Sequence, residues 1–220
     1  MKVVAIVPIK LNSQRLPHKN LLSIAGHPMC WHICNTLSKV KKIEEVYVYC
    51  STPTIKEFLP QKVKYKERPE WLDRDEIKGF DIYREFIKEV EADIYVLAHT
   101  TSPFISRNSI ENALEHVLCG ENDSAFSAER IQTFAWYRNQ PINYELNDVP
   151  RTQDMEPIWI ETSGFYVFRK EVFTDYSRRI GLSPYIQEVS GIEAIDIDER
   201  KDYEYACKIA ELFEAEVEEK

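Results

Sequence analysis

Short apolar runs and longer amphipathic stripes alternate along the chain. Residues 3–7 form an uninterrupted apolar run rich in β-branched side chains, which is typical of a strand buried on both faces of a parallel sheet. Further strands are predicted at residues 46–50, 63–65, 94–97, 158–168 and 195–197. Helices are predicted at residues 28–40, 73–91, 106–119 and 200–217, where apolar side chains recur with a helical period. This alternation predicts an α/β fold with a mostly parallel central sheet and helices on both faces.

The alternation stops at about residues 128–157. Phe134, Trp136 and Tyr137 lie there among Gln, Asn, Pro and Arg without a clear helical period. We therefore expect an insertion with strand character instead of another strand-helix repeat. The three aromatic side chains fit an interface with a second subunit, and they fit an ordinary core as well.

The last predicted helix is acidic, and its apolar positions recur at helical spacing. These positions are expected to face inward: Tyr203, Ala206, Cys207, Ala210 and Phe213. No repeat or low-complexity linker interrupts the sequence, so residues 1–220 are expected to form one domain.

Composition restricts the partners of the chain. Its 220 residues carry 28 Lys and Arg against 37 Asp and Glu, a formal net charge of -9. Such a surface repels nucleic acid and anionic membranes, so we expect neither as a partner, and a phosphate ligand needs a local basic patch. The five cysteines form no CxxC pair and are expected to be buried in a reducing cytosol. Because no signal peptide or long apolar span occurs, we expect a soluble, cytoplasmic protein.

A basic loop follows the first strand, at the place where ligands bind in open α/β sheets. The first glycine of the chain is Gly26, which excludes the GxGxxG turn and the Walker A loop. Phosphate would therefore be held by side chains, and three cations in the loop suit a polyphosphate. A solvated basic loop explains these charges about equally well. The candidate ligand-binding residues are Lys10, Asn12, Ser13, Arg15, Lys19 and Asn20.

Two carboxylates alternate with apolar residues in the segment Ile195-Asp196-Ile197-Asp198. On a strand, residues i and i+2 point to the same side, so Asp196 and Asp198 can converge. Two carboxylates suit Mg²⁺, which completes its coordination with water and substrate phosphates. In the alternative, Asp198 caps the terminal helix and Asp196 is solvated; the residues by themselves favour this alternative.

The basic loop resembles the N-terminal signature of the CMP-sugar synthetases, the cytidylyltransferases that activate sialic acids and 3-deoxy-manno-octulosonate. Arg15 is typical of the octulosonate branch and Asn20 of the sialic acid branch. Lys10 stands where both branches have arginine, which keeps the charge but loses the bidentate fork. The residues shared with both branches are Ser13, Leu16, Pro17 and Lys19.

The resemblance extends to the other residues of the nucleotide side. CMP-sialic acid synthetases carry the same I-D-I-D element before the last helix, which implies that Asp196 and Asp198 bind a metal. Asp202 would be a helix-start charge or lie beyond the direct metal ligands. The segment from Arg68 to Leu72 is similar to the family's R-P-x-x-L segment near the cytosine and ribose pocket, which implies that Arg68 contacts the nucleotide.

On the acceptor side the chain departs more from the family. Residues 151–166 resemble the family segment whose Arg and Gln face an acidic, hydroxyl-rich acceptor, and whose glycine permits close approach of ligand or metal. Ser163 replaces the usual Asn. His99 stands where a sugar-contacting Gln is expected, although an isolated histidine is usually structural. The implied acceptor-binding residues are His99, Thr101, Arg151, Gln153, Ser163 and Gly164.

The resemblance implies a Rossmann-like nucleotide-diphospho-sugar transferase fold of the GT-A type and a CTP-dependent cytidylyltransferase. The anomeric hydroxyl of a sialic acid-like 2-keto-3-deoxy sugar would attack the α-phosphorus of CTP and release pyrophosphate, forming a CMP-sugar for surface polysaccharide biosynthesis. Arg15, Lys19 and Asp198 would be catalytic, with Mg²⁺ as cofactor. Family members are usually homodimers in which the 130–160 region reaches over the partner's site.

Two alternatives stay open. The same fold could act on another acceptor, such as a phosphonate or an unusual capsular sugar acid, as His99, Ser163 and the aromatic insertion suggest. The chain could instead be a non-catalytic nucleotide-binding protein. The presence of both the carboxylate pair and the basic loop argues against this second alternative.

Overall fold

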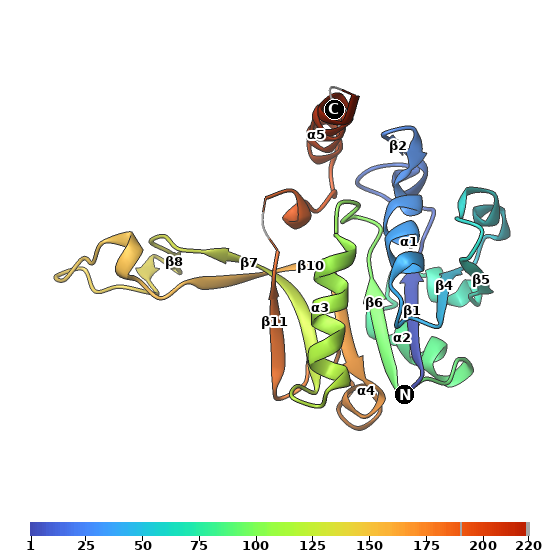
Figure 1. Ribbon diagram of the computed structural model, residues 1–220, viewed down its shortest axis with the longest axis horizontal. Coiled ribbons are helices and arrows are strands. Elements are labelled where there is room, and N and C mark those ends of the chain that lie inside the picture. The colour runs from blue at the N-terminus through green and yellow to red at the C-terminus, as the bar shows by residue number, and fades with distance from the viewer. Residues whose placement is uncertain (190, 219–220) are drawn as a thin grey trace.

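A central sheet carries the fold, and a two-stranded arm extends from it (Figure 1). The computed structural model describes residues 1–189 and 191–218, with side chains described to residue 212. The sheet has seven strands in the order β11-β7-β10-β6-β1-β4-β5. β10 runs antiparallel to β6 and β7, and the other strand pairs of the described sheet are parallel, as predicted. The bounds are β1 Val3–Pro8, β4 Glu45–Cys50, β5 Lys64–Glu67, β6 Ile94–Ala98, β7 Ser124–Ile131, β10 Ile158–Arg169 and β11 Pro184–Glu188.

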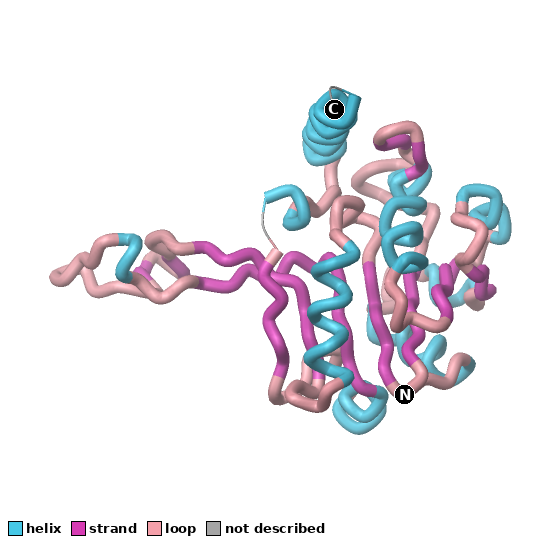
Figure 2. Tube along the Cα trace, in the orientation of Figure 1, coloured by secondary structure: helices cyan, strands magenta, loops and turns pink. Residues whose placement is uncertain are grey.

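Helices cover both faces of the sheet, as the hydrophobic pattern predicts (Figure 2). Helices α1 (Met29–Lys39) and α3 (Arg107–Leu118) pack on one face, and α2 (Gly79–Glu89) and α4 (Lys170–Tyr176) pack on the other. Strand β1 lies between these layers, and residues 3–7 are each at most 2% exposed. None of the described helices is both long and apolar enough to cross a membrane.

Beyond the carboxyl ends of the parallel strands lie the loop that follows β1 and the last helix, α5 (Arg200–Glu218) (Figure 1). The loop contains the 3₁₀ turn η1 (Lys19–Leu21) and the hairpin of β2 (Ser23–Ile24) and β3 (His27–Pro28). Ala206 and Ala210 of α5 pack with Ile197 in a separate apolar cluster, which confirms the predicted inward face. Phe213, predicted to share that face, lies outside the described side chains.

Several local predictions were wrong. The helix predicted from residue 73 begins at Gly79, because the 3₁₀ turn η3 (Glu70–Asp73) comes first and Asp81 accepts a hydrogen bond from the Lys78 N–H at the helix start. Residues 195–197 do not form a strand; they follow the 3₁₀ turn η5 (Gly191–Ala194). Helix α4 and strand β11 were missed, because seven residues are too few to show a helical period and β11 begins with a proline. Cys119 at the end of α3 is exposed.

The arm contains the predicted insertion. Strands β7 and β10 stay paired from Glu161 opposite Ala128 out to Ile158 opposite Ile131. Figure 1 shows the arm extending away from the sheet and its helices. Its outer part holds the short strands β8 (Trp136–Tyr137) and β9 (Gln140–Pro141) and the 3₁₀ turn η4 (Thr152–Asp154). The strand character predicted for about residues 128–157 is confirmed in part, at the end of β7 and in β8 and β9, while the rest of the range forms turns and loops.

Gly164 tests how tightly β10 packs at the base of the arm. A Cβ at this position would lie 2.8 Å from Ile105 Cδ1 and 3.2 Å from Ser127 Oγ. Gly164→Ala is therefore expected to lower the free energy of unfolding by about 1–3 kcal/mol, measured by urea denaturation. In an Ile105→Ala background, which makes room for the methyl group, the same change should cost clearly less. An equal cost in both backgrounds would contradict overpacking.

Candidate active site

The loop after β1 and the end of β6 enclose a cavity of about 290 Å³. The strands meet there because β1 and β6 are parallel neighbours whose carboxyl ends lie at the same edge. The cavity brings together seven residues proposed from the sequence. It is lined by Pro8, Lys10, Asn12, Ser13, Lys19, Asn20, His99, Thr100 and Thr101.

Asn20 holds the basic loop against the sheet. Its side chain is buried, and its Nδ2 donates a 2.8 Å hydrogen bond to the backbone oxygen of Lys10. Its Oδ1 accepts a hydrogen bond from the Thr100 hydroxyl. Both the donor and the acceptor group of the Asn20 amide are thus hydrogen-bonded, so this side chain fixes the shape of the loop. The loop contains no glycine and cannot form a standard glycine-rich phosphate-binding turn.

Two loop cations meet the second carboxylate of the I-D-I-D segment. Arg15 Nη1 lies 2.9 Å from one oxygen of Asp198, and Lys19 Nζ lies 3.1 Å from the other. Lys19 Nζ also donates to the backbone oxygen of Ile197 at 3.1 Å. Lys19 is only 12% exposed, whereas Arg15 is 63% exposed. The N-terminal loop and the segment before α5 are therefore joined by charge at the rim of the cavity.

Asp196 and Asp198 are the two carboxylates predicted to bind Mg²⁺, and the structure places both beside the basic loop. Ile197 between them is buried, and its N–H donates to the Thr101 oxygen at 2.8 Å, which pins the segment beside the cavity. Partial desolvation raises the pKa of Asp196, opposed by a hydrogen bond from Thr101, and the charge of Asp198 raises it further. Desolvation also acts on Asp198, but Lys19 and Arg15 lower its pKa overall. In the described residues, no third His, Cys, Asp or Glu joins this pair.

Asp202 has the helix-start role that the resemblance allowed. Its Oδ2 accepts hydrogen bonds from the N–H groups of Asp198 and Glu199, at 3.1 and 2.8 Å. A carboxylate there also interacts favourably with the positive end of the α5 dipole. Asp198 is thereby left to pair with the loop cations and does not serve as the side-chain cap of the helix.

Lys10 has a partner that the sequence did not reveal. Its Nζ lies 3.3 Å from one oxygen of Asp75, and Gln14 donates to the other oxygen at 3.3 Å. Asp75 lies in the turn before α2, where the sequence predicted helix instead. A long-range ion pair of this kind leaves no local signal in the sequence.

His99 lines the same cavity and connects the end of β6 to β10. Its Nδ1 donates to the backbone oxygen of Ser163 at 2.6 Å, so Nε2 accepts from the Tyr83 hydroxyl at 3.3 Å. Ser163 adopts a left-handed conformation, φ 58°, where the pairing of β10 with β7 is irregular. The Gly164 oxygen accepts from the His99 N–H at 3.1 Å. His99, Ser163 and Gly164 therefore come together as predicted, with Tyr83 as a partner that sequence reasoning missed.

Other proposed residues lie away from this cavity. Arg151 and Gln153 are on the exposed outer part of the arm, where Arg151 Nε pairs with Asp154 at 2.7 Å. Arg68 follows β5 and is 1% exposed; it pairs with Asp73, while its Nε has no partner among the described residues. The structure thus places Arg68 at the same sheet edge but outside the cavity lining.

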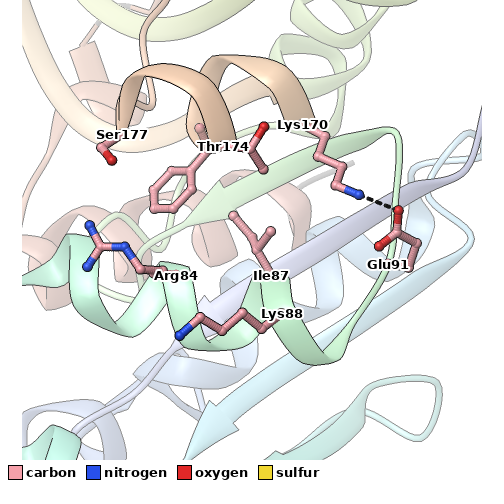
Figure 3. A pocket seen from close by; sticks show the side chains of 8 residues that line it. Arg84, Ile87, Lys88, Glu91, Lys170, Thr174 and Ser177 are labelled. Carbon is pink, nitrogen blue, oxygen red and sulfur yellow. Dashed lines mark hydrogen bonds and ion pairs between the residues drawn. The ribbon is translucent and has the colours of Figure 1, made fainter.

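A second hollow, of about 340 Å³, lies between α2 and α4 (Figure 3). Its apolar lining comes from Ile87 and Phe173. Its three cations already pair with acids: Arg84 with Asp81, Lys88 with Glu85 and Lys170 with Glu91. It contains none of the residues proposed from the sequence, so the cavity beside β1 and β6 is the candidate active site.

The environment of His99 predicts a histidine that resists protonation. Burial lowers its pKa from the ordinary value, and the nearby charges of Arg179 and Lys19 lower it further, against the effect of the Ser163 hydrogen bond. Because the unfolded state then binds the proton more readily, this site should reduce stability as pH falls below about 6.5. Histidine NMR titration should show His99 titrating below the ordinary range. Titration at or above 6.5 would contradict this prediction.

A sequence model of the cytidylyltransferase family matches residues 4–219. The 3-deoxy-manno-octulosonate cytidylyltransferase of Escherichia coli is 25% identical over 190 residues, covering 80% of this chain and 76% of that enzyme. The N-acylneuraminate cytidylyltransferase of Streptococcus agalactiae serotype III is 22% identical over 214 residues, covering 92% of this chain. The chain spans 52% of that streptococcal relative, about half its length.

A solved structure shows the same fold. The structure of a CMP:2-keto-3-deoxy-manno-octonic acid synthetase complexed with CTP superimposes with a TM-score of 0.73 at 22% identity, covering 98% of this chain and all of that one. The observed sheet and its flanking helices are thus those of an α/β nucleotidyltransferase. Since the family match runs from β1 through the basic loop, the carboxylate pair and α5, the chain belongs to the cytidylyltransferase family.

Proposed function

We propose that the chain transfers CMP from CTP to an acidic sugar and releases pyrophosphate. The observation that carries this proposal is the contact of Arg15 and Lys19 with Asp198 at the cavity rim, where phosphate-binding cations and a candidate metal ligand occupy one place. The similar enzymes named above act on acidic sugars, which supports a sialic acid-like 2-keto-3-deoxy acceptor. A cytoplasmic location and a role in surface polysaccharide synthesis belong to the same proposal.

In the proposed reaction, the acceptor hydroxyl attacks the α-phosphorus of CTP in line with the departing pyrophosphate. Arg15 and Lys19 leave Asp198 and bind the phosphates, because a polyphosphate offers them more charge than one carboxylate does. Mg²⁺ bound by Asp196 and Asp198 would neutralise charge at the α-phosphate. Lys10, Asn12 and Ser13 line the path of the nucleotide, and His99 and Thr101 face the acceptor. Catalysis of this kind depends on positioning and electrostatics.

Another acceptor for the same chemistry is a second candidate. His99 and Ser163 differ from the residues usual in the family, and they are hydrogen-bonded to each other. An unusual capsular sugar acid or a phosphonate would use the same nucleotide side. A non-catalytic nucleotide-binding role is the remaining candidate.

Pyrophosphate release measures the proposed reaction directly. With Mg²⁺ and CTP, we expect release with one of N-acetylneuraminate, legionaminate, pseudaminate or 3-deoxy-manno-octulosonate, and little with ATP, GTP or UTP. Asp198→Asn should lose most turnover yet bind CTP more tightly than wild type without Mg²⁺, because Arg15 and Lys19 are released. Silence with every acid, while CTP still raises the melting temperature, would favour an unusual acceptor or a non-catalytic role. Full Mg²⁺-dependent activity of Asp198→Asn would refute the metal assignment.

We further propose a homodimer in which the arm of each subunit covers the partner's cavity. Large apolar side chains are exposed on the described arm, which suits a protein interface. Within one chain, Arg151 and Gln153 lie on the outer arm, distant in the fold from the cavity that they were predicted to serve (Figure 1). A partner's arm would bring them to the acceptor. The exposed apolar residues are Phe134, Trp136, Tyr137, Ile142, Leu146, Val149, Trp159 and Ile160.

Subunit mixing tests this arrangement. Arg151→Ala and Asp198→Asn should each be nearly inactive, but co-refolding them in equal amounts should restore roughly a quarter of wild-type turnover through mixed dimers with one intact site. A control mixture of Arg151→Ala with itself should restore nothing. If Arg151 acts within its own chain, or not at all, the mixture will only average the two variants.

A further inference from the structure

Arg179 is a partly buried cation that contacts Glu161 and Tyr166 of β10, outside the residues that line the cavity. It lies between α4 and β11, and its guanidinium stacks 3.8 Å from the centre of the Tyr166 ring. Its Nη2 donates to Glu161 Oε1 at 2.9 Å. The side chain is 24% exposed. Stacking on the ring fixes the plane of the guanidinium, so its free N–H groups have a defined direction.

Two tyrosines connect Arg179 to His99, which lines the cavity. The Tyr166 ring meets the His99 ring edge to face at 6.2 Å. The Tyr83 hydroxyl donates to His99 Nε2 at 3.3 Å; burial raises the pKa of that hydroxyl, and the nearby charge of Arg179 opposes the rise. Arg179 therefore lies beside the tyrosines that contact the His99 ring.

The other cations near the cavity have nucleotide-side partners. Arg15 and Lys19 contact Asp198, and Lys10 contacts Asp75. Arg151 lies on the outer arm of the same chain. Among the described residues, Arg179 is the arginine whose guanidinium lies over a tyrosine ring that in turn packs against His99.

Glu161, the partner of Arg179, is placed so that a ligand carboxylate can replace it. Glu161 is 39% exposed and contacts Arg179 through one carboxylate oxygen, not as a bidentate pair. The same oxygen accepts a hydrogen bond from the Tyr166 hydroxyl. If Glu161 were released from Arg179, it would keep its hydrogen bond with Tyr166 and its contact with solvent. A ligand carboxylate could then form a bidentate pair with the guanidinium.

We propose that Arg179 determines acceptor specificity by binding the acid group of the acceptor in place of Glu161. This assignment rests on the proposed function and adds the residue that distinguishes an acidic acceptor from a neutral one. The adjacent Arg178 provides a matched control, because it is exposed and its guanidinium lies over the Tyr176 ring at 5.9 Å instead.

The first test compares Arg179→Met with Arg178→Met in the pyrophosphate assay. Arg179→Met should raise KM for the sugar acid by roughly ten- to a hundredfold, the range of a lost hydrogen bond to a charged group, with KM for CTP unchanged. It should also lose the preference of the wild type for the acid over its methyl ester. Arg178→Met should resemble the wild type. An unchanged acceptor KM in Arg179→Met would overturn the proposal while leaving the proposed function intact.

The second test uses Glu161→Gln, which distinguishes a ligand-binding role of Arg179 from a purely structural role. If Glu161 competes with the acceptor for Arg179, the variant should lower KM for the sugar acid. If the ion pair of Arg179 and Glu161 only stabilises the structure of β10, both Glu161→Gln and Arg179→Met should raise KM for the sugar acid and lower the melting temperature. That result would overturn the proposal. Inactivity of the wild type with every acid, despite CTP binding, would refute the proposed function and this assignment with it.

Discussion

The site depends on one ion-pair cluster, that of Asp198 with Arg15 and Lys19. It joins a loop at the start of the chain to a segment more than 170 residues later, and each side is fixed independently. Asn20 ties the loop to the end of β6, and the buried Ile197 ties the carboxylate segment to Thr101. Because Lys19 is largely buried, its charge is poorly compensated by solvent and needs an anion nearby. A carboxylate supplies that anion in the absence of ligand, and a phosphate can supply it when ligand binds.

The sheet determines which groups can meet there. Parallel pairing of β1 with β6 places the basic loop beside His99 and Thr101 at one edge. The antiparallel strand β10 then crosses that edge and continues into the arm, so its irregular step at Ser163 lies directly beside His99. Gly164 has no room for a side chain because Ile105 fills that space. Its role in positioning β10 is therefore visible as packing, and its backbone oxygen already holds the His99 N–H.

Local patterns predicted the parts of the molecule that local interactions determine. The uninterrupted β-branched run predicted β1 as a strand buried on both faces, and the helical spacing predicted α3, and the structure contains both. The I-D-I-D pattern predicted two converging carboxylates on a strand, but their segment is held by one backbone hydrogen bond to Thr101 and not by a sheet. Asp75, Tyr83 and Arg179 escaped prediction because each acts on a residue far away in sequence. No periodicity records such a pairing, and only the fold brings the partners together.

In the proposed reaction, a ligand anion replaces an internal carboxylate as the partner of a cation. Such an exchange would explain how an acidic protein can receive acidic ligands. The net charge is -9, yet cations around the site are paired with internal acids: Lys10 with Asp75, Arg15 and Lys19 with Asp198, and Arg179 with Glu161. Without these acids the cations would repel one another in a partly buried loop. With these acids in place, an incoming anion must displace a carboxylate, so a weakly charged or monodentate ligand gains little binding free energy. A triphosphate gains more, since it offers several oxygens to Arg15 and Lys19. Selectivity for highly charged ligands then follows from competition within the protein and not from a strongly positive surface.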